Sequence, residues 1–178
     1  MSDCSRRQFL QASSVLLPAV LFPTALSSCV AAAPITDVGI ALEPYPDTWL
    51  PAGIRSRFAN DINGLRIHVL EAGYESAGRP ALLLLHGFPE LAYSWRKIMP
   101  TLAAAGYYVV APDQRGYSRT IGSEDGYDAD LTPFRFLNLV RDALALVLPV
   151  GHRQTTAVVG HDFRSSVVLY CALARAGS

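Results

Sequence analysis

The sequence predicts an α/β domain in which an antiparallel hairpin leads into a mostly parallel sheet flanked by helices. Three apolar runs, PALLLLHG, YYVVAPD and TTAVVGHD, have the length and the continuous hydrophobicity of strands buried on both faces. Helical patterns lie between these runs. Because strands that alternate with helices form parallel βαβ units with right-handed crossovers, we expect the three strands to run parallel in one sheet.

The hairpin is the first predicted element. Residues 57–61 and 65–73 have the composition of strands, and they flank Asn63-Gly64. This dipeptide is typical of the tight turn between two antiparallel strands.

The first two buried strands are expected at residues 80–87 and 107–113, with a helix over residues 93–105 between them. Pro100 should kink or split that helix, because proline lacks a backbone N–H and clashes with the preceding turn.

A longer helix is predicted over residues 132–151. Thr132 is its expected N-cap and Pro133 its first helical residue. Its apolar residues recur at spacings of three and four, which indicates an amphipathic helix: Phe136, Leu139, Val140, Leu144 and Val147. The third buried strand follows at residues 155–162, and a last helix begins after it.

The composition predicts one domain: the chain has 178 residues, a mass of 19.2 kDa and 51% hydrophobic residues. Residues 34–54, rich in proline and without periodicity, are interpreted as a linker or lead-in to a domain of residues 55–178. Fifteen basic and 15 acidic residues balance, so the charge gives no support for a nucleic-acid partner. The cysteines have no metal-ligand spacing and suggest no disulfide framework: Cys4, Cys29 and Cys171.

The first 33 residues predict a bacterial export signal. Arg6 and Arg7 precede an apolar run, an order that resembles the twin-arginine signal. The run is interrupted by prolines and is short for a spanning helix, which needs about 20 apolar residues. It ends in LSSC, which resembles a lipobox with Cys29 as the lipidated residue, whereas cleavage near Ala33 would give ordinary secretion. Both outcomes place the mature protein in the periplasm or at the membrane; a disordered N-terminal arm is the alternative.

The segment GHDFR, residues 160–164, follows the third buried strand and opens the last helix. In that setting a sharp turn projects one side chain from the end of the sheet, as in a nucleophile elbow, and that position belongs to Asp162. An aspartate there can displace a leaving group at a saturated carbon and form an ester, which water then hydrolyses. Asp162 could equally be the N-cap of the last helix, and GHD alone does not decide between the two roles.

A second segment, residues 86–120, reads HGFPELAYSWRKIMPTLAAAGYYVVAPDQRGYSRT. Together with the elbow it resembles the epoxide hydrolase branch of the α/β-hydrolase family, from about residue 57 to residue 171. The resemblance implies an α/β-hydrolase fold and an enzyme that opens an epoxide, its small-molecule substrate, through an ester on Asp162. Backbone N–H groups of Phe88 and Phe163 would form the oxyanion hole. No metal or organic cofactor is implied.

The same resemblance assigns roles around the oxyanion loop. His86, Gly87 and Pro89 would shape that loop, and Asp113 with Arg115 would tie down the loop after the second buried strand. Trp95 is a candidate pocket residue, although filling space under the loop is an equal alternative.

Dehalogenation is the alternative reaction within this family. Haloalkane dehalogenases hold the departing halide with N–H donors, often a tryptophan beside the nucleophile, whereas Phe88 and Phe163 have no side-chain donor. Fluoroacetate dehalogenases resemble HDRG at the elbow, but this chain has Phe163 after the aspartate and Arg164 one place later. Epoxide hydrolysis is therefore favoured over haloalkane or haloacid dehalogenation.

Residues 163–178 contain no His, Asp or Glu, although the family places its acid and histidine after the nucleophile. The pair of cap tyrosines that protonates an opening epoxide is absent too, since Tyr170 stands alone. We therefore expect a partial hydrolase core, truncated before the cap domain and the last strands, and inactive as given. Ser118 and Arg164 replace small residues of the family pattern, and Arg164 should crowd the turn. A non-catalytic exported lipoprotein or gene remnant is the alternative.

Overall fold

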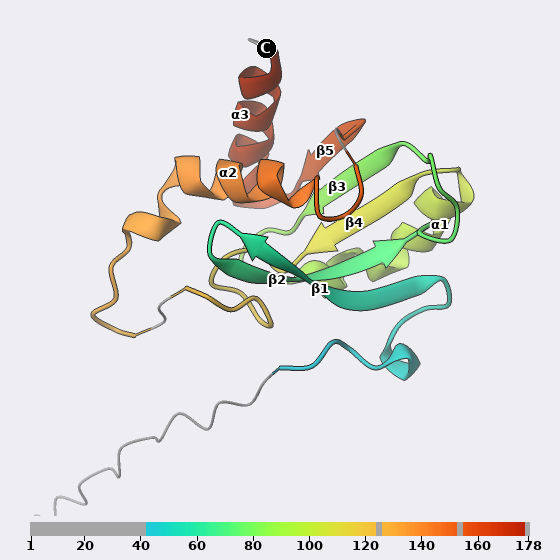
Figure 1. Ribbon diagram of the computed structural model, residues 1–178, viewed down its shortest axis with the longest axis horizontal. Coiled ribbons are helices and arrows are strands. Elements are labelled where there is room, and N and C mark those ends of the chain that lie inside the picture. Colours follow the sequence, from blue (N-terminus) through green and yellow to red (C-terminus); the bar gives the residue numbers. More distant parts are fainter. Residues whose placement is uncertain (1–41, 124–125, 153–154, 177–178) are drawn as a thin grey trace, which may run out of the picture. The chain divides into compact units, whose positions relative to one another are not determined.

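Residues 42–123, 126–152 and 155–176 are described by the computed structural model (Figure 1). The expected export signal with Cys29, and the first part of the expected linker, lie outside the described residues. Within the described part of the chain, every helix is too short or too polar to cross a membrane.

Five described strands form one mixed sheet in the order β1-β2-β4-β3-β5 (Figure 1). They are β1 (Ile54–Ile62), β2 (Leu65–Ala72), β3 (Ala81–Leu85), β4 (Tyr108–Pro112) and β5 (Ala157–Gly160). β2 is antiparallel to both β1 and β4, whereas β3 runs parallel to β4 and to β5. The predicted hairpin and the predicted parallel strands are confirmed.

The turn between β1 and β2 is the one that the sequence predicts. Asn63 and Gly64 have φ values of 51° and 79°, and Ile62 pairs with Leu65 across the turn. Two positive φ values define the tight turn whose twist matches that of the flanking strands.

The helix expected over residues 93–105 is split, but not at Pro100. The 3₁₀ turn η3 (Ala92–Lys97) and the helix α1 (Met99–Ala104) meet at Ile98. Pro100 lies in the first turn of α1, where the N–H that proline lacks would have no helical partner. The proline therefore helps to start α1 instead of breaking it.

The helix expected from Thr132 begins later. Thr132 starts a separate 3₁₀ turn, η4 (Thr132–Phe134), and the helix α2 spans Phe136–Leu146. Between them Arg135 is extended, with φ −59° and ψ 146°, and α2 has no side-chain cap. The prediction of Thr132 as the N-cap of the long helix is therefore wrong.

Alternate strand residues face two separate apolar clusters, which explains why the strands are apolar throughout. The α2–α3 cluster joins one face of the sheet to α2 and to the last helix α3 (Ser165–Ala176): Ile67, Val69, Leu83, Leu85, Val110, Leu139, Leu146 and Val167. The α1 cluster lies on the other face: Leu70, Ala72, Leu82, Leu84, Val109, Ala111 and Met99.

The prediction that the third apolar run is buried on both faces is wrong. β5 is an edge strand that pairs only with β3 among the described strands, and Val159 is 42% exposed. Val158 packs against the α2–α3 cluster, so one face of β5 is covered. Val159 belongs to neither apolar cluster.

The second half of the segment interpreted as a linker or lead-in lies against the domain. Tyr45 donates its backbone N–H to Ser56 Oγ at 2.8 Å, and its ring packs edge-on to His68 at 5.2 Å. A 3₁₀ turn, η2 (Asp47–Trp49), then leads to β1.

Candidate active site

Asp162 lies in a sharp turn between β5 and α3. It is the first residue of the 3₁₀ turn η5 (Asp162–Arg164), and its φ is +53°. A left-handed backbone costs most residues other than glycine about 1–2 kcal/mol and aspartate less, and such conformations are concentrated at functional sites. The N-cap of η5 is His161, so Asp162 is not the helix cap that its alternative role required.

Gly160 makes this turn possible because the following helix lies directly against it. A Cβ on Gly160 would lie 2.6 Å from Val168 Cγ2 and 2.7 Å from the carbonyl oxygen of Arg164. Only a residue without a Cβ allows this approach. The N–H of His161 also donates to the carbonyl oxygen of Leu85 at 3.1 Å, which ties the elbow to the end of β3.

The loop after β3 brings backbone N–H groups to the Asp162 carboxylate. The N–H of Phe88 donates to Asp162 Oδ2 at 3.4 Å, and a Cβ on Gly87 would lie 2.8 Å from Asp162 Cβ. Pro89 follows a cis peptide bond. Hydrogen bonds from the N–H of Phe163, and then from that of Phe88, lower the pKa of Asp162. The structure thus brings the expected nucleophile together with both expected N–H donors.

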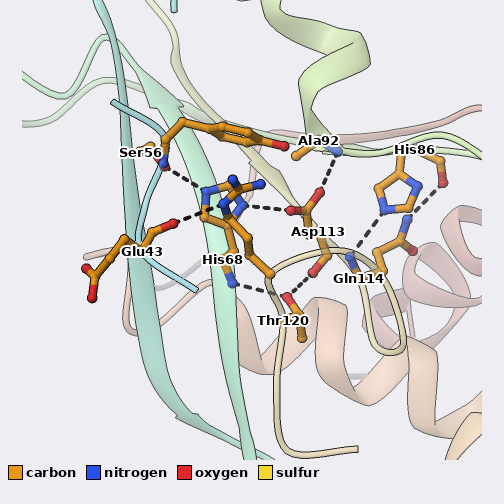
Figure 2. A network of polar contacts seen from close by, with 10 residues as sticks. Glu43, Ser56, His68, His86, Ala92, Asp113, Gln114 and Thr120 are labelled. Atoms are coloured by element: carbon orange, nitrogen blue, oxygen red, sulfur yellow. Dashed lines mark hydrogen bonds and ion pairs between the residues drawn. The ribbon is translucent and has the colours of Figure 1, made fainter. Parts of the chain in front are cut away.

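His86 holds the shape of this loop. It is buried; its Nδ1 lies 2.9 Å from the carbonyl oxygen of Gly87, and its Nε2 accepts the N–H of Gln114 at 3.2 Å (Figure 2). Burial is the main cause that lowers the pKa of His86, so the ring is neutral with its proton on Nδ1. Gln114 Nε2 donates in return to the carbonyl oxygen of His86 at 2.8 Å.

Asp113 connects the loop after β4 with η3 and, through His68, with both strands of the hairpin. Its Oδ1 accepts the N–H of Ala92 at 2.8 Å, at the start of η3, and its Oδ2 lies 2.8 Å from His68 Nδ1 on β2 (Figure 2). His68 Nε2 lies 2.7 Å from Ser56 Oγ on β1. Asp113 therefore anchors η3, the helical turn that follows the oxyanion loop, to the hairpin.

Arg115 anchors the same loop to α2. Its Nε donates to Asp142 Oδ2 at 2.7 Å and its Nη2 to Asp142 Oδ1 at 3.0 Å, with both side chains nearly buried. Asn63 Nδ2 donates to Asp142 Oδ1 at 2.9 Å. The interpretation of Asp113 and Arg115 as residues that tie down a loop is confirmed.

An open cavity of about 700 Å³ lies beside the elbow. Its volume is within the range of about 300–1,000 Å³ that is usual for small-molecule sites. The lining residues come from the oxyanion loop, the loop after β4, η4, α2 and the elbow: Phe88, Arg115, Gly116, Tyr117, Phe134, Leu139, Asp162, Phe163 and Arg164.

Ser118 and Arg164, which replace small residues of the family pattern, differ in backbone conformation. Ser118 has a φ of +46°, a conformation that favours the glycine it replaces. Arg164 has no positive φ, and its side chain is buried, with its guanidinium carbon 5.6 Å from the centre of the Tyr117 ring. The expected crowding of the turn by Arg164 stays a prediction.

Trp95 is not among the residues that line this cavity. It packs against the α1 cluster, on the other face of the sheet from α2 and α3. Trp95 therefore does not line the cavity beside the elbow. Its alternative role, filling space under the oxyanion loop, stays a prediction.

None of the four histidines, all of which lie in the described part of the chain, donates a hydrogen bond to the Asp162 carboxylate. His68 and His86 are buried in the networks above, and His152 stacks on Tyr108. His161, beside Asp162, pairs with Glu90 at 3.4 Å.

The same part of the chain matches known proteins. A family model described as the alpha/beta hydrolase fold matches residues 80–175. Epoxide hydrolase A of Mycobacterium tuberculosis is 46% identical over 110 residues, which are 61% of this chain and 31% of that protein. An epoxide hydrolase of Caballeronia sordidicola is 38% identical over 113 residues, which are 64% of this chain and 31% of that protein.

Solved structures give the same result. Epoxide hydrolase A from Mycobacterium thermoresistibile superposes with a TM-score of 0.59 at 39% identity, over 67% of this chain and 34% of that chain. The epoxide hydrolase VrEH1 from Vigna radiata has a TM-score of 0.59 at 37% identity, over 70% of this chain and 37% of that chain. The chain thus spans about a third of the length of the first curated relatives and solved structures that it matches.

Proposed function

Because this chain belongs to the α/β-hydrolase fold family, we propose that it carries the nucleophile and the oxyanion hole of an enzyme that hydrolyses epoxides. The observation that carries the proposal is the strained backbone of Asp162, which holds its carboxylate 3.4 Å from the N–H of Phe88 beside an open cavity. The similarity to several epoxide hydrolases supports this choice of substrate.

In the first step, a carboxylate oxygen of Asp162 attacks a ring carbon of the epoxide. A carbon–oxygen bond to the protein forms as the ring bond breaks, and the released alkoxide takes a proton from water. Asp162 is ionised at neutral pH, since hydrogen bonds from the N–H of Phe163 and then of Phe88 hold its pKa below the ordinary value. The ionised carboxylate is the nucleophilic form.

In the second step, water attacks the carbonyl carbon of the ester. The charge that develops on the former carboxylate oxygen is stabilised by the N–H groups of Phe88 and Phe163, which already donate to Asp162. Cleavage of the acyl carbon–oxygen bond releases a vicinal diol and restores Asp162. This step needs a base to activate water, and residues 163–178 contain no His, Asp or Glu to serve as that base.

We therefore expect a protein of residues 1–178 to form the ester faster than it hydrolyses it. Incubation with styrene oxide should add the mass of one epoxide molecule to the chain, and peptide mapping should locate the addition on Asp162. The matched control is Asp130→Asn. Asp130 is also an exposed carboxylate with a pKa lowered by a backbone hydrogen bond, but it is not at the elbow.

Two outcomes would contradict the proposal. Labelling that is lost in Asp130→Asn, or spread over several exposed carboxylates, would show that Asp162 is not a special nucleophile. Sustained diol formation by the unaltered chain that is lost in Asp162→Asn would show instead that a group acts as the base of the second step.

We also propose that the chain is exported, because Arg6 and Arg7 precede an apolar run that ends near Cys29. Replacing both arginines with lysine should retain the protein in the cytoplasm of a bacterial host, whereas the unaltered chain should fractionate with the periplasm or the membrane. Loss of the membrane fraction in Cys29→Ser would assign a lipid anchor. An unchanged distribution in the lysine variant would contradict export by this route.

A further inference from the structure

Arg164 is a buried cation without a full set of partners. The residue is 5% exposed, and its Nη1 atom has no hydrogen-bond partner among the described residues. Arg115, which lines the same cavity, is held by two hydrogen bonds to Asp142. A guanidinium taken out of water needs a compensating acceptor, because its lost hydration is otherwise not replaced.

The surroundings of Arg164 are mostly aromatic. Its guanidinium carbon lies 5.6 Å from the centre of the Tyr117 ring and 5.7 Å from that of the Phe163 ring. Ring faces attract a cation at such distances, but they do not replace a hydrogen-bond acceptor for Nη1. Burial lowers the pKa of Arg164, and the side chain of Tyr117 opposes this shift through its charge and a hydrogen bond. An arginine keeps its proton in proteins, so the group remains a charged donor.

Arg164 also lies where it can act on a bound molecule. It is two residues after Asp162, and both residues line the cavity beside the elbow. The carboxylate of Asp162 would repel a negatively charged substrate, so an anion is accepted there only if a cation compensates this repulsion.

We propose that Arg164 binds a carboxylate of the substrate, so that the cavity selects small oxirane acids. A carboxylate is planar and presents two oxygens that match the donor fork of a guanidinium. Because Nη1 is buried, an entering anion must displace a neighbouring side chain to reach it. Phe163 is the candidate, since it is 60% exposed and its ring centre lies 5.7 Å from the guanidinium carbon. The oxirane part of the assignment rests on the proposed function, whereas the carboxylate part does not.

The carboxylate part can be tested on the full chain without any reaction. Cyclopropanecarboxylate has the shape of an oxirane acid but no reactive ring oxygen, and cyclopropanecarboxamide is its neutral counterpart. We expect the acid to bind at least about tenfold more tightly than the amide in an NMR titration, as charge-assisted hydrogen bonds are the stronger kind. In protein labelled with ¹⁵N-arginine, the acid should shift one arginine side-chain resonance and the amide none.

Variants assign the effect to the residue. Arg164→Gln should remove the preference for the acid, whereas Arg141→Gln, at an exposed arginine that does not line the cavity, should keep it. Asp162→Asn should strengthen binding of the acid, because it removes a like charge from the same cavity. If Arg164→Gln does not fold, the resonance shift in the unaltered chain and the Asp162→Asn titration still test whether Arg164 binds the carboxylate.

Equal binding of acid and amide to the unaltered chain would overturn the proposal. So would a preference for the acid that survives in folded Arg164→Gln, or displacement of the acid by chloride at equal concentration, which would indicate a halide site. Binding as expected in a chain that forms no ester would contradict the proposed function and leave this inference standing.

Discussion

The Asp162→Asn variant is expected to form no ester with an epoxide while keeping its fold. An amide is a poor nucleophile, so the first step is lost completely. Asparagine tolerates a left-handed backbone at least as well as aspartate does, and the φ of +53° at this position is therefore no obstacle to folding. Intact-mass analysis after incubation with styrene oxide, together with thermal unfolding, measures both effects.

The Asp162→Ala variant separates chemistry from backbone strain. Alanine also lacks a nucleophile, but in the left-handed conformation it should lower the free energy of unfolding by about 1–2 kcal/mol. Loss of the ester in both variants, with loss of stability in the alanine variant alone, is the expected pattern. An ester that still forms in Asp162→Asn would exclude Asp162 as the nucleophile.

The pH dependence of ester formation follows from the same residue. Hydrogen bonds from the N–H of Phe163, and then of Phe88, lower the pKa of Asp162 below its ordinary value of 3.8. The reactive carboxylate is therefore fully present above that ordinary value and is lost only as the pH falls through the lowered pKa. Labelling should not change between about pH 7 and pH 5, whereas a decline within this range would indicate that a histidine takes part.

Local sequence patterns predicted most of the sheet. Asn63-Gly64 defines its turn through backbone preferences alone, and the apolar runs of β3 and β4 are buried as expected. The exposure of β5 could not be predicted in the same way, because its run of apolar residues is compatible with either a central or an edge position. The order of the strands in the whole sheet decides between a central and an edge position.

The elbow was predicted because its residues are consecutive and follow a predicted strand, and because residues 86–120 resemble the same family. The spacing of glycine and aspartate alone left the role of an N-cap open. The partners of Asp113 and Asp142 were not predicted, because they are distant in the chain. His68 lies 45 residues before Asp113, and Asn63 lies 79 residues before Asp142. The burial of Arg164 was missed for a different reason: the sequence indicated a bulky residue in a tight turn, but not the cavity toward which the side chain extends.

The Asp142→Asn variant is expected to lower the free energy of unfolding by about 3–5 kcal/mol, because it leaves the guanidinium of Arg115 buried without its counter-charge. Asparagine has nearly the shape of aspartate, so the effect measures charge and not packing. Chemical denaturation gives the free energy. Asp128→Asn, at an exposed position, is the control and should change stability by less than about 0.5 kcal/mol.

The double variant Arg115→Met with Asp142→Leu removes both charges of the buried ion pair. It tests whether the ion pair itself stabilises the fold, or whether only the loss of one partner destabilises it. Apolar residues of similar volume often replace a buried ion pair at little cost, so the double variant should be more stable than Asp142→Asn. Because Arg115 and Gly116 line the cavity, the double variant should also keep the cavity wall, and Asp162 should be labelled by styrene oxide as in the unaltered chain. A double variant no more stable than Asp142→Asn would mean that the hydrogen bonds of Asp142, including that from Asn63, hold α2 to the hairpin turn irrespective of charge.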